Sequence, residues 1–194
     1  LVMVSPPNQH GYVNLGPTCF YTPGSIRRGK KEGHLRLVIA EVNDQLPIVH
    51  GDNWMHISEF DQFIEISRPL PSVPRGEASA IEKAISQYAL ELIKDGDIIQ
   101  MGIGGISEAV AAGLDGRHDL GILSEMMPTA LPDLMEKGIV SNRKKELHTG
   151  VSLATFCVGD KALYDYLHEN PLTQLMPGEY TNNPRFIAQH SNVV

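Results

Sequence analysis

The chain has 194 residues, 42% of them hydrophobic and 20% charged, a composition typical of a globular protein that buries a sizeable core. A net charge of −7 without a long basic run argues against nucleic acid as a partner, and no apolar run approaches the ~20 residues that cross a bilayer. The pairs Lys30-Lys31 and Lys144-Lys145 are short and are expected to lie in solvated loops. Cys19 and Cys157 lie far apart and form no CxxC motif, which is typical of a reducing compartment, so we expect a cytoplasmic protein.

Residues 1–67 contain several short runs of strand character. The strongest is 35–42, where β-branched and other apolar residues predict a mostly buried strand. Further strands are expected at 2–4, 54–58 and 63–66, with a short helix at 25–31 and a loop at 43–52.

Residues 68–76 hold three prolines and a glycine. Proline removes a backbone donor and disfavours helix in the residue before it, so this segment is typical of a linker. We therefore predict a first domain over 1–67 and a second over 77–194.

Helices and strands alternate in the predicted second domain. The pattern of residues 77–94 predicts a helix that carries Ile81, Ala84, Ile85, Tyr88, Leu92 and Ile93 on one face. Strands are expected at 98–102, 120–124, 151–158 and 186–189, and helices at 106–114, 131–137 and 161–167. This alternation predicts an α/β fold with a parallel sheet, whose active site lies at the carboxyl ends of the strands.

A glycine turn, Gly102-Ile103-Gly104-Gly105, follows the strand at 98–102 and opens the next helix near Ile106. Without Cβ atoms the glycines permit positive φ and close approach to the backbone, and the free N–H groups of the helix start point into the same space. Such a turn suits an anion, a phosphate or a developing oxyanion, although a plain strand-to-helix turn without a ligand explains the pattern equally well.

Glu125 ends the next strand, beside Met126 and Met127. A carboxylate at an apolar strand end is partly desolvated and can act as a nucleophile, whereas taken alone it is more often a surface glutamate. The turn and Glu125 together also fit a dinucleotide fingerprint, with Ser107 in place of the third glycine and Glu125 near the spacing of the acid that binds the ribose. The residue pattern alone leaves both interpretations open.

Other polar residues attract attention but carry weaker signals. Glu59 is a second candidate carboxylate, for which we favour a structural role. His50, Asp52 and His56 near it match no metal-binding spacing, so hydrogen bonding within loops is expected and no metal site is predicted. Residues 182–184, Asn-Asn-Pro, are expected to form a turn.

Several separated stretches, in the right order, resemble the acetyl-CoA hydrolase/transferase family, in particular 4-hydroxybutyrate and butyrate:acetate CoA-transferases. The matching stretches are residues 4–16, 38–47, 50–52, 56–59, 102–106, 121–126, 161–166 and 180–184. The resemblance implies two similar open parallel-sheet domains of CoA-transferase type, both incomplete in this chain, because family members are about twice as long. It also implies a homo-oligomer.

The same resemblance implies a site. The family's nucleophile falls on Glu125, and the glycine loop that contacts coenzyme A falls on Gly102, Ile103, Gly104, Gly105 and Ile106. The substrates would be an acyl-CoA and a small carboxylic acid, with the coenzyme A carried on Glu125 as a thioester, and no permanently bound cofactor is implied. Asn182 would lie on the active-site side of the second domain as a weak contact.

Two positions depart from the family pattern. Leu123 stands where His or Tyr is usual, and Ser107-Glu108 where Pro-Asn or Pro-Asp is usual. Both bear on substrate choice more than on the chemistry. Three alternatives stay open: an acyl-CoA hydrolase that uses the same glutamate with water as acceptor, an NAD-binding oxidoreductase, and a non-catalytic fragment.

Overall fold

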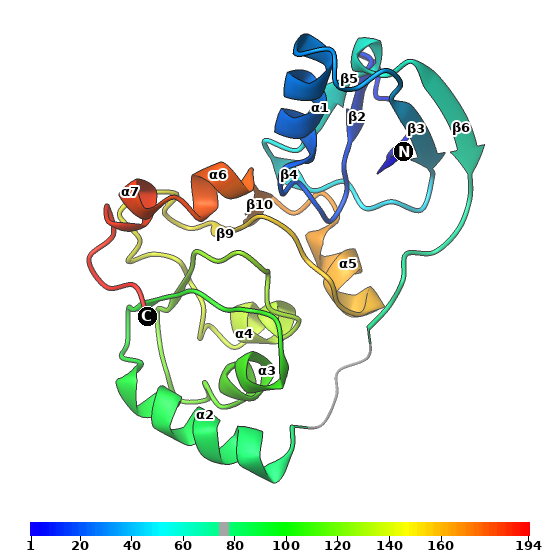
Figure 1. The fold of residues 1–194 in the computed structure, drawn as a ribbon. Helices are drawn as coiled ribbons and strands as arrows, with labels where there is room; N and C mark the ends of the chain where they lie inside the picture. The colour runs from blue at the N-terminus through cyan, green and yellow to red at the C-terminus, as the bar shows by residue number, and fades with distance from the viewer. Residues whose placement is uncertain (74–77) are drawn as a thin grey trace.

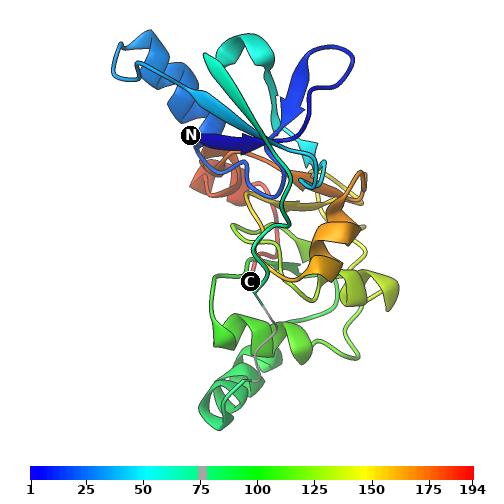
Figure 2. The ribbon, with the colours of Figure 1, turned by 90° about the vertical axis from the view of Figure 1, so that its right-hand side faces the viewer.

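A computed structural model describes residues 1–73 and 78–194 as a mixed α/β fold (Figure 1). Figure 2 shows an elongated molecule, with residues 1–67 at one end and helix α2 (Ala80–Leu92) at the other. The predicted linker at 68–76 overlaps residues 74–77, which lie outside the described residues.

The first 67 residues form a small layered unit. Strands β1, β3 and β6 make a parallel sheet in that order, β2 and β5 pair in antiparallel fashion, and helix α1 packs beside them (Figure 1). The bounds are β1 Val2–Val4, β2 Tyr12–Asn14, α1 Thr22–Lys31, β3 Ile39–Asn43, β5 Trp54–His56, a 3₁₀ turn Ile57–Glu59 and β6 Gln62–Ile66. The predicted strand at 35–42 begins only at Ile39, and β2 was not predicted.

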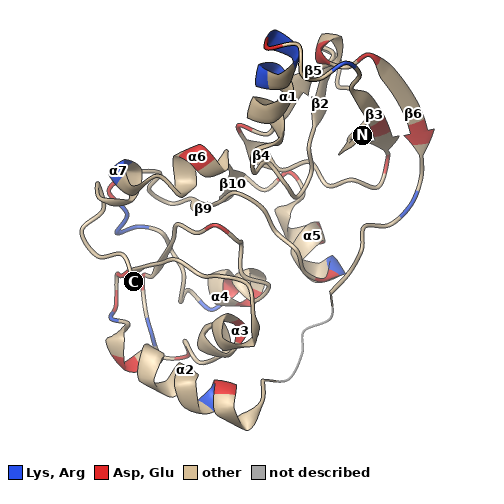
Figure 3. Ribbon diagram, in the orientation of Figure 1, with Lys and Arg blue, Asp and Glu red and all other residues tan. Residues whose placement is uncertain are grey.

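The residues at the two ends of helix α1 suit their positions in a helix. Pro23 lies in its first turn, where a missing N–H costs no hydrogen bond, and Arg28, Lys30 and Lys31 lie in its last turn. Cations there complement the negative end of the helix dipole, and the ribbon of α1 carries basic residues, coloured blue in Figure 3.

A run of parallel strands crosses the rest of the molecule. Residues 192–194 pair with β7, β7 pairs with β8, a single bridge from Leu123 to Leu153 leads to β9, and β10 lies between β9 and β4. The bounds are β4 His50–Gly51, β7 Ile98–Ile99, β8 Gly121–Ile122, β9 Ser152–Ala154 and β10 Thr173–Leu175. A loop was predicted over residues 43–52, and this prediction is wrong at its C-terminal end, where β4 lies. A strand from the first 67 residues thus shares a sheet with later strands, and the division into two domains stays a prediction.

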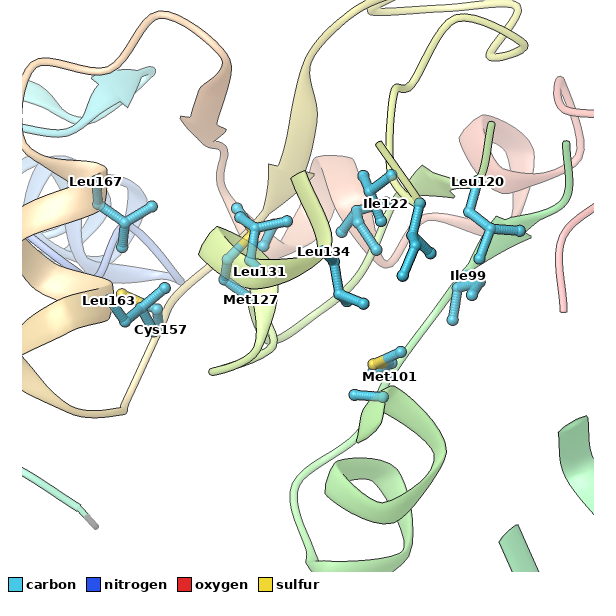
Figure 4. Packing of buried hydrophobic residues seen from close by; sticks show 14 of the residues in the cluster. Ile99, Met101, Leu120, Ile122, Met127, Leu131, Leu134, Cys157, Leu163 and Leu167 are labelled. Carbon is cyan, nitrogen blue, oxygen red and sulfur yellow. The ribbon is translucent and has the colours of Figure 1, made fainter. Parts of the chain in front are cut away.

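The main hydrophobic core lies between these strands and helices α3 (Gly105–Ala112), α4 (Leu131–Glu136) and α5 (Lys161–Leu167). Figure 4 shows side chains from α4, α5 and the strands packed in one continuous row. Cys19 and Val49 join this core, so it also includes residues from the first part of the chain. The helices predicted at 106–114, 131–137 and 161–167 are confirmed to within two residues at each end.

Two short helices end the fold, α6 (Gly178–Thr181) and α7 (Pro184–Ile187). The strand predicted at 186–189 is wrong, because α7 occupies its first residues. Asn183 caps α7 by accepting a hydrogen bond from the backbone N–H of Arg185 at 3.0 Å, and Pro184 opens the helix with a preset φ. The expected turn at 182–184 is the junction between α6 and α7.

The apolar face predicted for α2 lies in solvent. Ile81 and Tyr88 are each 73% exposed and Leu92 is 68% exposed. The helix contacts α3 through its opposite side, where Leu90 approaches so closely that a Cβ at Gly113 would lie 2.4 Å from its Cδ1. Among the described residues, none of the helices is both long and apolar enough to cross a membrane.

The contrast between α5 and α2 gives a stability test. Leu163 of α5 is fully buried, so Leu163→Ala is expected to lower the free energy of unfolding by about 2–5 kcal/mol through lost packing and a residual cavity. Leu92→Ala, the same change on an exposed helix position, should change it by less than about 0.5 kcal/mol. Urea denaturation measures both. Equal losses would show that the outer face of α2 is covered in solution.

Candidate active site

The glycine turn and Glu125 begin from the ends of adjacent strands. The Ser124 hydroxyl donates to the Met101 carbonyl at 2.8 Å and accepts from the Met101 N–H at 2.9 Å. One step back, the Leu123 N–H donates to the Ile99 carbonyl at 3.2 Å. Ser124, which precedes Glu125, therefore holds the backbone of Met101, which precedes Gly102.

All five residues predicted for the glycine loop, 102–106, are exposed or half-buried. Gly104 has a φ of 138°, a conformation that side chains rarely permit, and no atom lies near the place of a Cβ there. Gly105 begins α3, and a Cβ on it would meet the Glu82 carboxylate, the end of a flexible side chain that would have to shift. The first N–H groups of α3 thus follow an open turn.

Glu125 is half-buried, and both its backbone and its carboxylate are held in place. Its carbonyl accepts hydrogen bonds from the N–H groups of Thr155 at 3.0 Å and Phe156 at 3.2 Å, which join it to the segment after β9. Its carboxylate oxygen Oε2 accepts a hydrogen bond from Nδ2 of Asn182 at 2.7 Å. Asn182 is the C-cap residue of α6, and its own Oδ1 accepts from the Thr181 hydroxyl at 3.0 Å. The residue expected to be a weak contact is thus the direct partner of the predicted nucleophile.

Two side chains that the sequence did not single out hold the strand before Glu125. Asn142 Oδ1 accepts a hydrogen bond from the Ile122 N–H at 2.8 Å, and Lys145 Nζ donates to the carbonyls of Ile122 at 2.9 Å and Val151 at 2.6 Å. Lys145 is 3% exposed, so the solvated loop predicted for it is wrong. Both residues lie in a polar stretch without a motif. Only the packing of this stretch shows that these side chains make the hydrogen bonds that a neighbouring strand would otherwise make.

Burial also decides which nucleophiles are available near Glu125. Cys19 lies close by, because its N–H donates to the Thr155 carbonyl while the Thr155 N–H donates to the Glu125 carbonyl. Desolvation, followed by the charge of Asp52, raises the pKa of the Cys19 thiol to about 12. A thiol is a poor nucleophile until it ionises, so Cys19 does not compete with the carboxylate at neutral pH.

The other residues named from the sequence take structural places. Glu59 accepts hydrogen bonds from Arg27 Nε at 2.8 Å and Nη2 at 3.1 Å, and this pairing lowers the pKa of Glu59. The structural role favoured for Glu59 stays a prediction, with which this ion pair agrees. Leu123 is 1% exposed and packs inward, so its side chain does not line the site. Glu108 accepts a hydrogen bond from the Thr129 hydroxyl at 3.2 Å. Among the described residues, no three His, Cys, Asp or Glu side chains form a group suited to a metal ion.

Ser124→Ala should destabilise the fold through the Met101 backbone. The variant leaves two buried backbone groups without their partner, and we expect a loss of about 2–4 kcal/mol in the free energy of unfolding. Ser86→Ala is the matched control, because Ser86 is also buried but donates only to the Lys83 carbonyl of its own helix. A near-neutral Ser124→Ala would contradict the bridging role.

Lys145 should make stability depend on pH. Burial lowers the pKa of Lys145 from its ordinary value to about 7, so between pH 7 and pH 10 the unfolded chain binds more protons than the folded one. Stability therefore rises with pH across this window, and the penalty is complete below pH 7. Relative to Lys145→Met, the natural protein should gain roughly 2–4 kcal/mol between pH 7 and pH 10, as measured by denaturation at each pH. Parallel pH profiles for the two proteins would show that Lys145 keeps an ordinary pKa.

Comparison with known proteins gives a consistent result. Residues 1–74 match the model of the acetyl-CoA hydrolase/transferase N-terminal domain. The chain is 39% identical over 192 residues to a succinyl-CoA:cyclohexane-1-carboxylate CoA transferase of Geobacter metallireducens, covering 99% of this chain and 43% of the relative. It is 38% identical over 194 residues to a 4-hydroxybutyrate coenzyme A transferase of Clostridium kluyveri, covering 100% of this chain and 44% of the relative.

Comparison of the fold with solved structures agrees with the sequence comparison. A crystal structure of 4-hydroxybutyrate CoA-transferase from Porphyromonas gingivalis matches with a TM-score of 0.89 and 38% identity, over 98% of this chain and 47% of that one. The chain thus spans less than half the length of the relatives it matches, and the resemblance found in its motifs is confirmed. Residues 1–74 thus match the N-terminal domain of the acetyl-CoA hydrolase/transferase family, and the chain as a whole is similar to CoA-transferases.

Proposed function

We propose that the whole protein is a CoA-transferase that moves coenzyme A between an acyl-CoA and a small carboxylic acid, with Glu125 as nucleophile. The carrying observation is the Glu125 carboxylate at the carboxyl end of its strand, held by the Asn182 amide. Its strand is joined through Ser124 to the residue before the glycine turn. Relatives named as CoA-transferases support the same class of reaction.

The proposed reaction needs only the carboxylate and the two substrates. A Glu125 oxygen attacks the thioester carbonyl, the CoA thiolate leaves, and a mixed anhydride of Glu125 and the acyl group forms. The thiolate then attacks the glutamyl carbonyl and releases the acyl group as a free carboxylate, which leaves CoA on Glu125 as a thioester. An acceptor carboxylate repeats these steps in reverse and departs as the new acyl-CoA.

The glycine turn is the proposed contact for coenzyme A and for the developing oxyanion. Residues 102–106 are exposed or half-buried, and the N–H groups at the start of α3, beside the Glu82 carboxylate, supply the proposed donors. One such donor is typically worth about 2.7–4 kcal/mol in the barrier, so the geometry of the turn matters nearly as much as the nucleophile.

The alternatives differ in what accepts the acyl or CoA group. A hydrolase would use the same Glu125 with water as acceptor. An NAD-binding oxidoreductase would instead use the Glu125 carboxylate to bind the ribose of the dinucleotide. Relatives named as CoA-transferases, in place of dinucleotide-dependent enzymes, disfavour the oxidoreductase. Acetate, butyrate or 4-hydroxybutyrate as the acceptor, a homo-oligomeric state, a cytoplasmic location and the two-domain division stay predictions.

The covalent step can be tested directly. The full-length protein is mixed with acetyl-CoA or succinyl-CoA in the absence of an acceptor, digested with trypsin and analysed by mass spectrometry. We expect a CoA adduct on the peptide 118–137, located at Glu125 by fragmentation, and loss of that adduct in Glu125→Ala. Acetate added afterwards should discharge the adduct faster than water does, whereas a hydrolase would show no such preference.

Glu136→Gln provides the matched control, because Glu136 is an exposed carboxylate in the same peptide at the end of α4. This variant should form the adduct at the natural rate. Undiminished turnover of acyl-CoA in Glu125→Ala would overturn the assignment of the nucleophile.

A further inference from the structure

The loop between α4 and β9 contacts, through different side chains, the strand that leads to Glu125 and the helix that ends at Asn182. Residues 142–150, called the bracing loop from here on, hold the strand before Glu125 through Asn142 and Lys145. The same loop places His148 against α6, the helix that ends at Asn182. The bracing loop thus contacts both the strand before Glu125 and helix α6.

His148 is fixed in an uncommon backbone conformation. Its φ is 52°, in the left-handed region that residues other than glycine rarely adopt, and its carbonyl accepts a hydrogen bond from the Val151 N–H at 3.1 Å. In this position its ring nitrogen Nε2 lies 2.8 Å from the Tyr180 hydroxyl. The ring of Tyr180 in turn packs against Phe186, with ring centroids 4.2 Å apart. The tyrosine is thus held at its hydroxyl and along its ring.

Tyr180 lies in a very short helix. Helix α6 has four residues, and its Gly178 N–H donates to the Phe20 carbonyl at 2.9 Å while Tyr180 is held at the other end of the helix. Asn182 follows Tyr180 by two residues, and its N–H donates to the Gly178 carbonyl at 2.9 Å within the same turn. A rotation of α6 after release of Tyr180 would therefore carry the Asn182 amide away from the Glu125 carboxylate.

We propose that His148 and Tyr180 are positioning residues that hold Asn182 against the Glu125 carboxylate, through their hydrogen bond at the base of α6. The inference rests on the proposed function of Glu125 and adds two residues outside the glycine turn to that site. Neither residue touches Glu125 in this arrangement, so each acts through Asn182.

The hydrogen bond can be removed without leaving a charge behind. Burial, and then the nearby Lys145, lower the pKa of His148, so the ring is mostly neutral at pH 7 and above. Tyr180→Phe then deletes one hydroxyl from a neutral pair and keeps the ring that packs on Phe186. His148→Phe deletes the same hydrogen bond from the other side.

The test is a double-mutant cycle on the full-length protein. The rate of CoA adduct formation on Glu125 is measured in a single turnover with acetyl-CoA, for the natural protein, Tyr180→Phe, Asn182→Ala and the double variant. Tyr180→Phe should slow the step roughly tenfold, because small misplacements of reacting groups cost large factors, with the concentration dependence on acetyl-CoA unchanged within about twofold. The double variant should be no slower than Asn182→Ala alone, since residues that act through one another are not additive.

His148→Phe should reproduce the slowing of Tyr180→Phe and add nothing to it when the two are combined. Tyr164→Phe is the matched control, because Tyr164 is a half-buried tyrosine whose hydroxyl donates to the Pro71 carbonyl at 3.0 Å, away from α6. It should form the adduct at the natural rate.

Each outcome separates the two proposals. If the natural protein forms the adduct and Tyr180→Phe forms it equally fast, the positioning role is overturned and the proposed function stands. A further tenfold slowing of Asn182→Ala by Tyr180→Phe would also overturn it, since the tyrosine would then act on the fold in general. If the natural protein forms no adduct on Glu125, the proposed function fails and this inference fails with it.

Discussion

The hydrogen bond from the Asn182 amide to the Glu125 carboxylate joins residues 57 positions apart and is the contact around which the candidate site is built. A half-buried carboxylate needs a partner to offset its lost hydration. Parallel order meets this need: β8 delivers Glu125 at its carboxyl end, and the chain after β10 delivers α6 and Asn182 at the corresponding edge. The site therefore depends on the sheet being assembled across β8, β9 and β10.

Strand β8 is too short to hold itself in place. It has two residues, and a single bridge after it reaches β9. Side chains complete the ladder instead: Ser124 satisfies the Met101 backbone, while Asn142 and Lys145 satisfy the N–H and carbonyl of Ile122. Each of these groups is buried, so an unmade hydrogen bond there would cost more than the net gain from a made one. Such a strand is specified by polar side chains from elsewhere in the chain as much as by its own apolar residues.

Local signals explain which parts of the fold could be predicted from the sequence. Helix α5 was predicted at its observed bounds, and the structure shows that Asp160 caps it by accepting a hydrogen bond from the Leu163 N–H. The strand expected at 186–189 failed because a capping Asn183 followed by Pro184 outweighs a short apolar run. The proposed nucleophile and the glycine turn were predicted from the residue pattern together with the family resemblance, and their roles stay predictions. Asn182, Lys145 and His148 take their places only through contacts distant in sequence, which no period or spacing encodes.

Under the proposed mechanism, the partners of two carboxylates separate their roles. Glu59 is held by two hydrogen bonds from a guanidinium, which fix its geometry and oppose any step that would consume its negative charge. Glu125 is held by one hydrogen bond from a neutral amide, which orients the carboxylate and leaves its second oxygen to attack. A cation in place of Asn182 would favour the resting carboxylate over the anhydride formed from it, and catalysis gains only from contacts that strengthen toward the transition state. A neutral, oriented donor is therefore the partner that a nucleophilic glutamate requires.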